Sequence, residues 1–432
     1  MTMTTPRLEP LVEKDHAFEW TPVQINLLEA QDFEHQAPGT ILRDFEALLS
    51  LIGDQGMPVT PAHLFAINGL ETINRNLTHP LELRLKRPIQ KSYPHIHGLY
   101  LLLRATGISL VDTQPKKPLL KLDPIVLESW RSLNGAERYF ALLKAWWGRA
   151  SEEMMGERRC WSADVLAKNI DFVERFPKTG ILKVEKPQDA DMLRYYPGLY
   201  NLALMELFGL LDIRAMPIEA AKGWLPEGIR MTDWGKTLLD GYADFINKSL
   251  GRNAESRLSM LGFTELFDPL NHFEQWSRVV RVYIKGWRKD LEIPVSLFQP
   301  GPHVFKVSLG VDCWRRIAIR GDACLDELAA TILSSVGFDS DHLYSFSYKD
   351  RFGRTVEIDH PYLTGESDNA LADDVKIGDL PLAEGMRIGF LFDFGDQWEF
   401  EIQTESVDAG PVSKKPRVLE RHGKAPKQHA GW

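Results

Sequence analysis

The sequence predicts an α+β protein, mainly because its hydrophobic period changes along the chain. Between Ile41 and Trp287 apolar residues recur mostly at three- and four-residue spacing, as on one face of a helix. From Val304 onward they alternate with polar residues, as in a strand with one buried face. The Pro-Gly-Pro segment at 300–302 indicates a boundary between the two regions. A chain of 432 residues is also too long for one ordinary core.

The first helices follow a proline-containing start. Residues 1–37 carry Pro6, Pro10 and Pro22, and they are predicted to form a loosely packed arm. A helix over 41–52 ends at Gly53, and Thr60 with Pro61 is predicted to be the N-cap and first residue of a second helix.

A third helix and a hairpin complete this region. Tyr93-Pro94 opens a helix that Gly107 closes. The short apolar runs at 108–111 and 119–122 flank a Pro/Lys turn, which predicts a hairpin. Three helices followed by a hairpin is the element order of a winged helix, so a winged-helix-like unit is predicted.

The order partly recurs after two intervening helices. Asp123-Pro124 starts one of these, and Asn134 with Glu137 offers a capping box for the other, which runs to Trp147. A Leu-rich helix at 199–211, two strands near 212–214 and 228–232, and a helix from Asp233 predict a second winged-helix-like unit. Residues 241–300 are predicted to be helical because their aromatic and Val residues keep helical spacing.

The last region predicts a sheet with one helix packed on it. Strands are expected near 304–309 and 315–319, then a helix over 325–336 that Asp322 caps and Gly337 ends. A strand at 342–348 and a hairpin of 390–394 with 398–402 follow, the hairpin turning at Gly395-Asp396. This order is similar to that of a β-grasp, so a β-grasp-like α+β domain is predicted.

Charge is distributed unevenly along the chain. Residues 301–410 hold 9 Lys+Arg against 21 Asp+Glu, a net charge of −12, whereas 411–432 carry +5. Residues 75–121 hold nine basic and two acidic residues, which favours an anionic partner. The basic tail is expected either to fold back on its acidic domain or to supply a further phosphate contact.

Composition excludes other classes of protein. No apolar run reaches the roughly 18 residues that span a bilayer, and residues 1–10 lack a secretory pattern, so no membrane association is expected. Cys160, Cys313 and Cys324 are widely spaced and form no CxxC pair, which favours a reducing cytoplasm. No Walker loop, dinucleotide fingerprint, nucleophile elbow or HExxH motif occurs, and no cofactor is predicted.

Three spaced motifs mark the C-terminal region. They are Cys313-Trp-Arg-Arg316, Asp341-His342-Leu343 and Phe392-Asp-Phe-Gly-Asp-Gln-Trp-Glu399. In this order, over about 302–432, they resemble the plasmid pRiA4b ORF-3-like family, found in bacterial plasmids, transposons and chromosomes. The resemblance implies a mobile-element-associated or chromosomal protein without an assigned activity.

The motif residues favour a structural role. They are Trp314, Arg315, Arg316, His342, Asp393, Gly395, Asp396 and Trp398. Arg315 shares a strand face with Ile317 and Ile319, so we expect it to point inward and to pair with Asp393 or Asp396. His342 is expected to be a hydrogen-bonded core histidine.

The alternative is a metal site. Asp393, Asp396 and His342, with Glu399 and Glu401 nearby, are ligand types that suit Mg²⁺ or Mn²⁺, and such a site implies a metal-dependent enzyme acting on nucleic acid. Against this, Glu399 and Glu401 alternate away from Trp398, which predicts a solvent-exposed face.

The basic segment is the other candidate site. A solvated surface and a DNA-binding surface are equally consistent with it. In the second interpretation the third helix and the hairpin tip reach the groove and the phosphates, through Arg84, Lys86, Arg87, Lys91, Arg104, Lys116 and Lys117.

The sequence therefore predicts a cytoplasmic, bacterial, non-enzymatic binding protein. DNA is the expected partner of residues 75–121, and a protein partner is the alternative for the acidic C-terminal domain. The predicted divisions are 1–37, 38–150, 151–245, 246–300, 301–410 and the basic tail 411–432.

Overall fold

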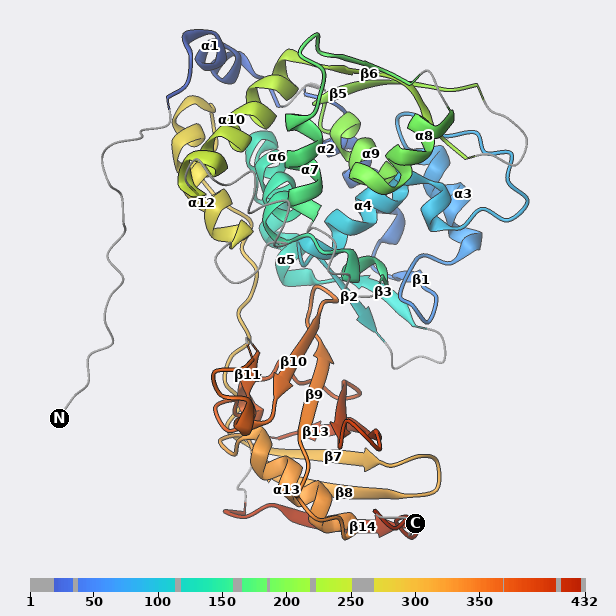
Figure 1. Ribbon diagram of the computed structural model, residues 1–432, viewed down its shortest axis with the longest axis vertical. Coiled ribbons are helices and arrows are strands. Elements are labelled where there is room, and N and C mark those ends of the chain that lie inside the picture. The colour runs from blue at the N-terminus through green and yellow to red at the C-terminus, as the bar shows by residue number, and fades with distance from the viewer. Residues whose placement is uncertain are drawn as a thin grey trace, which may run out of the picture.

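The computed structural model consists of a helical part and a strand-rich part, one above the other in Figure 1. It describes residues 19–33, 38–112, 118–157, 165–184, 187–217, 223–250, 268–367, 369–408 and 413–428. One hydrophobic core joins buried residues from Trp20 to Trp287, and a second joins buried residues from Phe305 to Ile402. The α+β fold class is confirmed.

The first unit of the helical part has a three-stranded antiparallel sheet in the order β1-β3-β2. Its elements are α2 (Ile41–Ile52), β1 (Met57–Pro58), α3 (Ile67–Asn76), α4 (Pro94–Ala105), β2 (Ser109–Asp112) and β3 (Leu119–Leu122). The predicted hairpin is present, and its tip at 113–117 lies outside the described residues.

The second unit repeats this order of helices and strands. Its elements are α7 (Val165–Glu174), β4 (Ile181–Lys183), α8 (Pro187–Leu193), α9 (Leu199–Leu207), β5 (Leu211–Ala215), β6 (Pro226–Met231) and α10 (Asp233–Leu250). Its sheet order is β4-β6-β5. The central strand is therefore the second strand of the hairpin in both units, β3 in the first and β6 in the second.

The third helices of the two units pack against each other. α4 contacts α9, and a Cβ added to Gly98 of α4 would lie 2.7 Å from Cγ of Leu204 on α9. Every residue of α4 is buried. α4 is therefore the central helix of this part of the molecule, with no face open to solvent.

Aromatic side chains fill the core between the units and the remaining helices. These helices are α1 (Pro22–Ala30), α5 (Pro124–Arg131), α6 (Gly135–Lys144) and α12 (Pro269–Val280). The ring of Trp147 stacks on Tyr242 with centroids 4.8 Å apart, and Phe140 stacks on Trp287 at 3.9 Å. Such rings bury large apolar areas, so this cluster supplies much of the apolar burial that holds α6, α10 and α12 together.

Three expectations for the helical part are wrong. Within the arm, the described residues 19–33 contain α1, which Thr21 caps and which Pro22 suits as its first residue, and its Leu28 is fully buried. Thr60 caps a turn, accepting from the Leu64 amide, and the helix begins only at Ile67. Residues 284–300 form no regular helix beyond the short turn at Arg281–Tyr283.

The strand-rich part is one eight-stranded sheet in the order β11-β10-β9-β12-β13-β7-β8-β14. Its strands are β7 (Pro302–Ser308), β8 (Trp314–Arg320), β9 (Tyr344–Lys349), β10 (Thr355–Asp359), β11 (Ala370–Leu371), β12 (Arg387–Phe392), β13 (Trp398–Val407) and β14 (Arg417–His422). α13 (Leu325–Val336) buries Leu325, Leu328 and Ile332 in the same core as Phe305 and Ile317.

The basic tail forms the last strand of the sheet, and α13 begins at a different cap from the one predicted. β14 pairs antiparallel with β8, which confirms that the basic tail folds back on its own domain. Asp322 does not cap α13, because its carboxylate pairs with Arg320 at 2.9 Å and the N-cap residue is Cys324. Gly337 ends the helix with a φ of 78°, as predicted.

In the described ranges, no helix is both long enough and apolar enough to cross a lipid bilayer.

Gly235 is expected to be one of the least replaceable positions of the second unit. A Cβ at this position would lie 1.9 Å from the Leu210 carbonyl oxygen, which is backbone and cannot rotate away. Gly235→Ala should therefore cost about 2–4 kcal/mol of unfolding free energy, measured by urea denaturation. The matched control is Gly228→Ala, because a Cβ there meets no atom closer than 3.9 Å. Equal losses for the two variants would contradict this account.

Candidate functional site

Arg315 lies in the core of the strand-rich part, as predicted, but its partners differ from those expected. Its side chain is 5% exposed. It donates to carbonyl oxygens of Ser335 at 3.0 Å, Trp314 at 2.8 Å and His422 at 2.8 Å. The expected pairing with Asp393 or Asp396 is therefore wrong. Arg315 instead joins the end of α13 to the β8–β14 edge.

The two neighbouring motif residues also stabilise this edge. Arg316 pairs with Glu405 on β13 at 2.6 Å and with Glu420 on β14. The ring of Trp314 stacks on His422, with centroids 5.4 Å apart. These contacts hold the last strand on the sheet.

Asp393 stabilises the turn between β12 and β13. It has a φ of 56° and its Oδ1 accepts from the amides of Gly395 at 2.9 Å and Asp396 at 3.3 Å. A carboxylate that accepts amides two and three residues ahead forms a local turn that tolerates left-handed backbone. The hairpin is confirmed, and its turn spans 393–397.

His342 is not a core histidine, since 41% of its side chain is exposed. Its Nε2 lies 3.5 Å from Oδ2 of Asp393 and 3.7 Å from Oδ1 of Asp341. Trp398 packs edge-on against Phe338 at 5.0 Å, and Glu399 and Glu401 are exposed, as predicted.

The residues of the alternative metal site do not cluster within the part of the chain that the structure describes. Among the described residues, which include Asp393, Asp396 and His342, no three His, Cys, Asp or Glu side chains gather in a way that could hold a metal ion. His342 Nε2 approaches the Asp393 carboxylate, whereas Asp396 contacts Asp393 through its backbone amide and is exposed.

The basic segment is divided by burial. Arg84, Lys86 and Arg87 are exposed on the irregular chain between α3 and α4. Lys91 is also exposed, but it pairs with Glu157. Lys116 and Lys117 lie outside the described residues.

Arg104 does not reach the surface. It is 4% exposed, and its guanidinium donates to Ser109 O at 3.1 Å and to Arg351 O at 3.3 Å. The expectation that it contacts a phosphate of nucleic acid does not fit this position, because α4 is buried along its whole length.

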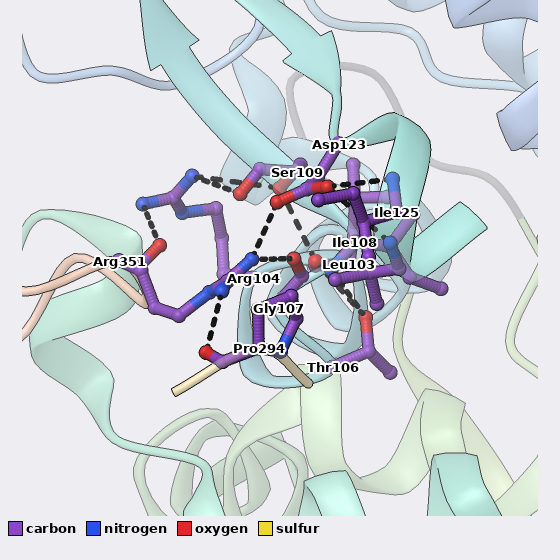
Figure 2. A network of polar contacts seen from close by, with 11 residues as sticks. Leu103, Arg104, Thr106, Gly107, Ile108, Ser109, Asp123, Ile125, Pro294 and Arg351 are labelled. Atoms are coloured by element: carbon purple, nitrogen blue, oxygen red, sulfur yellow. Dashed lines mark hydrogen bonds and ion pairs between the residues drawn. The ribbon is translucent and has the colours of Figure 1, made fainter. Parts of the chain in front are cut away.

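The β9–β10 hairpin covers Arg104, and sequence reasoning missed this contact. Arg351, in the turn between β9 and β10, donates to Asp123 Oδ2 at 2.7 Å, to Gly107 O at 3.1 Å and to Pro294 O at 3.2 Å. Figure 2 shows Arg104 and Arg351 side by side where α4 ends and β2 begins. Nothing in the spacing of residues 349–355 indicates a partner more than 200 positions away.

This junction carries two further contacts. The Thr355 amide donates to Glu153 Oε2 at 2.9 Å, and Phe352 packs against the helical core. The junction joins the two parts through a partly buried ion pair, backbone acceptors and an aromatic ring.

Comparison with known proteins gives a match for the strand-rich part. Residues 304–431 match the family model described as plasmid pRiA4b ORF-3-like protein. One similar solved structure is a protein of unknown function from Methanosarcina mazei Go1. It is 20% identical, covers 30% of this chain and 74% of its own, and has a TM-score of 0.27. No curated protein matches the chain.

Proposed function

From the premise that residues 304–431 form a plasmid pRiA4b ORF-3-like domain, we propose that the chain is a non-enzymatic nucleic-acid-binding protein that binds through its helical part. In this proposal 38–123 and 165–250 are winged-helix-like units. The repeated sheet order β1-β3-β2 and β4-β6-β5 supports that assignment. Because α4 and α9 are packed together, the surface that binds consists of loops and hairpins.

The observation that carries the proposal is the exposure of three cations that form no ion pair among the described residues. Arg84, Lys86 and Arg87 are exposed, and none pairs with a carboxylate of the described chain. The neighbouring basic residues are paired: Arg75 with Glu71 at 2.9 Å, Lys121 with Asp112 at 2.6 Å, and Lys91 with Glu157. Three adjacent unpaired cations are the groups that phosphate contact requires.

Charge reversal of these three residues tests the proposal. We expect Arg84→Glu/Lys86→Glu/Arg87→Glu to weaken binding of a mixed-sequence DNA duplex, measured by fluorescence anisotropy at several salt concentrations. The slope of log K against log salt should become shallower by about 3, since each phosphate contact contributes roughly 0.9.

The matched control changes the same net charge elsewhere. Lys285→Glu/Arg288→Glu/Lys289→Glu alters three exposed cations of the segment after α12. The control should keep most of the affinity and the salt slope. If both triple variants lose affinity equally, the effect is one of net charge and the proposed surface is wrong. If the unmodified protein binds DNA with no salt dependence, nucleic-acid binding through these cations is excluded.

A further inference from the structure

A cavity of about 450 Å³ lies between the helical part and the β9–β10 hairpin. The helical part contributes His63, Tyr100, Arg104 and Glu153 to its wall. The hairpin contributes Lys349, Gly353, Thr355 and Glu357. Pro61, Ala62 and Met154 add an apolar portion. A concave site of this size between two parts of a protein is the usual setting for a small ligand.

Arg104 is a buried cation that forms no ion pair with any carboxylate in the part of the chain that the structure describes. Its side chain is 4% exposed, and its acceptors are Ser109 O, Ser109 Oγ at 3.4 Å and Arg351 O. Among the described residues no carboxylate pairs with it. The nearby Asp350 carboxylate is engaged by the amides of Phe352 and Arg354 and by Arg354 Nε, each at 2.9 Å.

A guanidinium in this position is costly to leave unpaired. Taking a charge out of water costs several kcal/mol unless an opposite charge and hydrogen bonds compensate it. Burial is the largest cause and lowers the pKa of Arg104, and Tyr100 and the charge of Asp350 oppose only part of this lowering. The adjacent Arg351 shows the usual solution, because it pairs with Asp123 at 2.7 Å.

Lys349 adds positive potential next to Arg104, and His63 adds a neutral polar group. Burial, Arg104 and Lys349 lower the pKa of His63, so its imidazole is neutral at neutral pH and can donate or accept a hydrogen bond. His63 has a φ of 61°, and its carbonyl accepts from Tyr100 Oη at 2.5 Å, which fixes the residue in the wall. Lys349 is exposed and its Nζ donates to Thr355 Oγ1.

Three carboxylates also line the cavity, and among the described residues none of them forms an ion pair with Arg104 or Lys349. Glu153 accepts the Thr355 amide, and Glu157 pairs with Lys91. Glu357 is exposed on β10.

We propose that this cavity binds a small organic anion, whose phosphate or carboxylate group is the charge partner of Arg104 and Lys349 and whose apolar part lies against Pro61, Ala62 and Met154. Both parts of the protein supply groups to the ligand, so its binding also strengthens the contact between them. The site is separate from the proposed nucleic-acid surface at Arg84, Lys86 and Arg87.

Calorimetric titration of the full chain tests the proposal with three probes: inorganic phosphate, phenyl phosphate and benzoate. We expect phenyl phosphate or benzoate to bind with a dissociation constant of about 1 mM or less and to raise the melting temperature. Whichever binds identifies the anionic group. Inorganic phosphate should bind more weakly, because it lacks the apolar part.

Lys349→Ala is the decisive variant, because an exposed residue can be replaced without disturbing the core. This variant should raise the dissociation constant of the probe by about fivefold or more, since a charge-assisted hydrogen bond contributes more than about 1 kcal/mol. Lys285→Ala, which changes another exposed lysine outside the cavity wall, should leave the affinity unchanged. The proposal is overturned if no probe binds with a dissociation constant below about 10 mM, which corresponds to a binding free energy of about −2.7 kcal/mol. Unchanged affinity in Lys349→Ala would likewise place any binding elsewhere.

Discussion

Replacing Arg351 with alanine is expected to weaken the junction between the helical part and the strand-rich part by about 2–4 kcal/mol. The change removes three hydrogen bonds and leaves Asp123, which is 8% exposed, without its cationic partner. Asp123 keeps its contacts with the Ile125 and Val126 amides at the start of α5, so the loss is smaller than for a fully isolated buried charge.

Two measurements check this result. Urea denaturation of the full chain gives the loss of free energy, and small-angle scattering should show a larger radius of gyration as the two parts separate. In an Asp123→Asn background the loss caused by Arg351→Ala should shrink, because the amide needs no cation. The control is Arg387→Ala. Arg387 pairs with Glu401, and their side chains are 60% and 52% exposed, so losing this pair should lower the free energy of unfolding by less than about 1 kcal/mol. Equal effects of Arg351→Ala and Arg387→Ala would show that the junction is held by other contacts.

His97 is expected to make stability depend strongly on acidity. Burial, followed by the charge of Lys91, lowers the pKa of His97 to about 3 from its ordinary value of 6.5. Its Nδ1 lies 3.1 Å from Gln90 Nε2, and its ring meets Tyr200 edge-on. The folded protein therefore holds this imidazole neutral at a pH where the unfolded chain has already bound a proton.

The direction of the pH effect follows from that difference. Above about pH 6.5 His97 is neutral in both the folded and the unfolded chain, so it does not change the free energy of unfolding. As the pH falls from 6.5 toward 3, the unfolded chain binds a proton at His97 and the folded chain does not. Stability should fall in that window by up to roughly 5 kcal/mol, at 1.36 kcal/mol for each pH unit.

His97→Asn isolates this contribution. The Asn side chain offers an oxygen acceptor to Gln90 but does not titrate, so the variant should lose stability less steeply between pH 6.5 and 3. The measurement is urea denaturation at a series of pH values, with the exposed His79→Asn as control. Parallel profiles for the unmodified protein and His97→Asn would contradict the expectation, because His63, His303 and His360 contribute equally to both proteins.

Local features of the fold could be predicted from the sequence because they depend on neighbouring residues. The capping box of Asn134 and Glu137 is present, with reciprocal bonds of 3.0 and 2.9 Å. The second oxygen of Glu137, however, accepts the amides of Arg288 and Lys289. That contact joins segments about 150 residues apart, and nothing in the local pattern encodes it.

The candidate site shows the same division. Period-two alternation placed Arg315 in the core correctly, but the acceptors it bonds depend on where β14 and the end of α13 lie. The basic segment was correctly identified as a cluster of charge, yet only the packing of α4 against α9 reveals that Arg104 is buried while Arg84 and Lys86 are exposed. The cavity beside Arg104 exists only because the β9–β10 hairpin docks there, so no sequence pattern indicated it.

The burial of α4 on all sides has a consequence for how the chain can vary. A helix such as α2 alternates between buried residues, for example Phe45 and Leu48, and exposed ones such as Arg43 and Glu46, so substitutions are inexpensive on one side of it. α4 has no such side. Its twelve positions therefore form a continuous constraint between the two units. At positions of α4 that face α9, such as Gly98, a larger residue requires a change in Leu204 or its neighbours, so we expect substitutions in the two helices to be coupled.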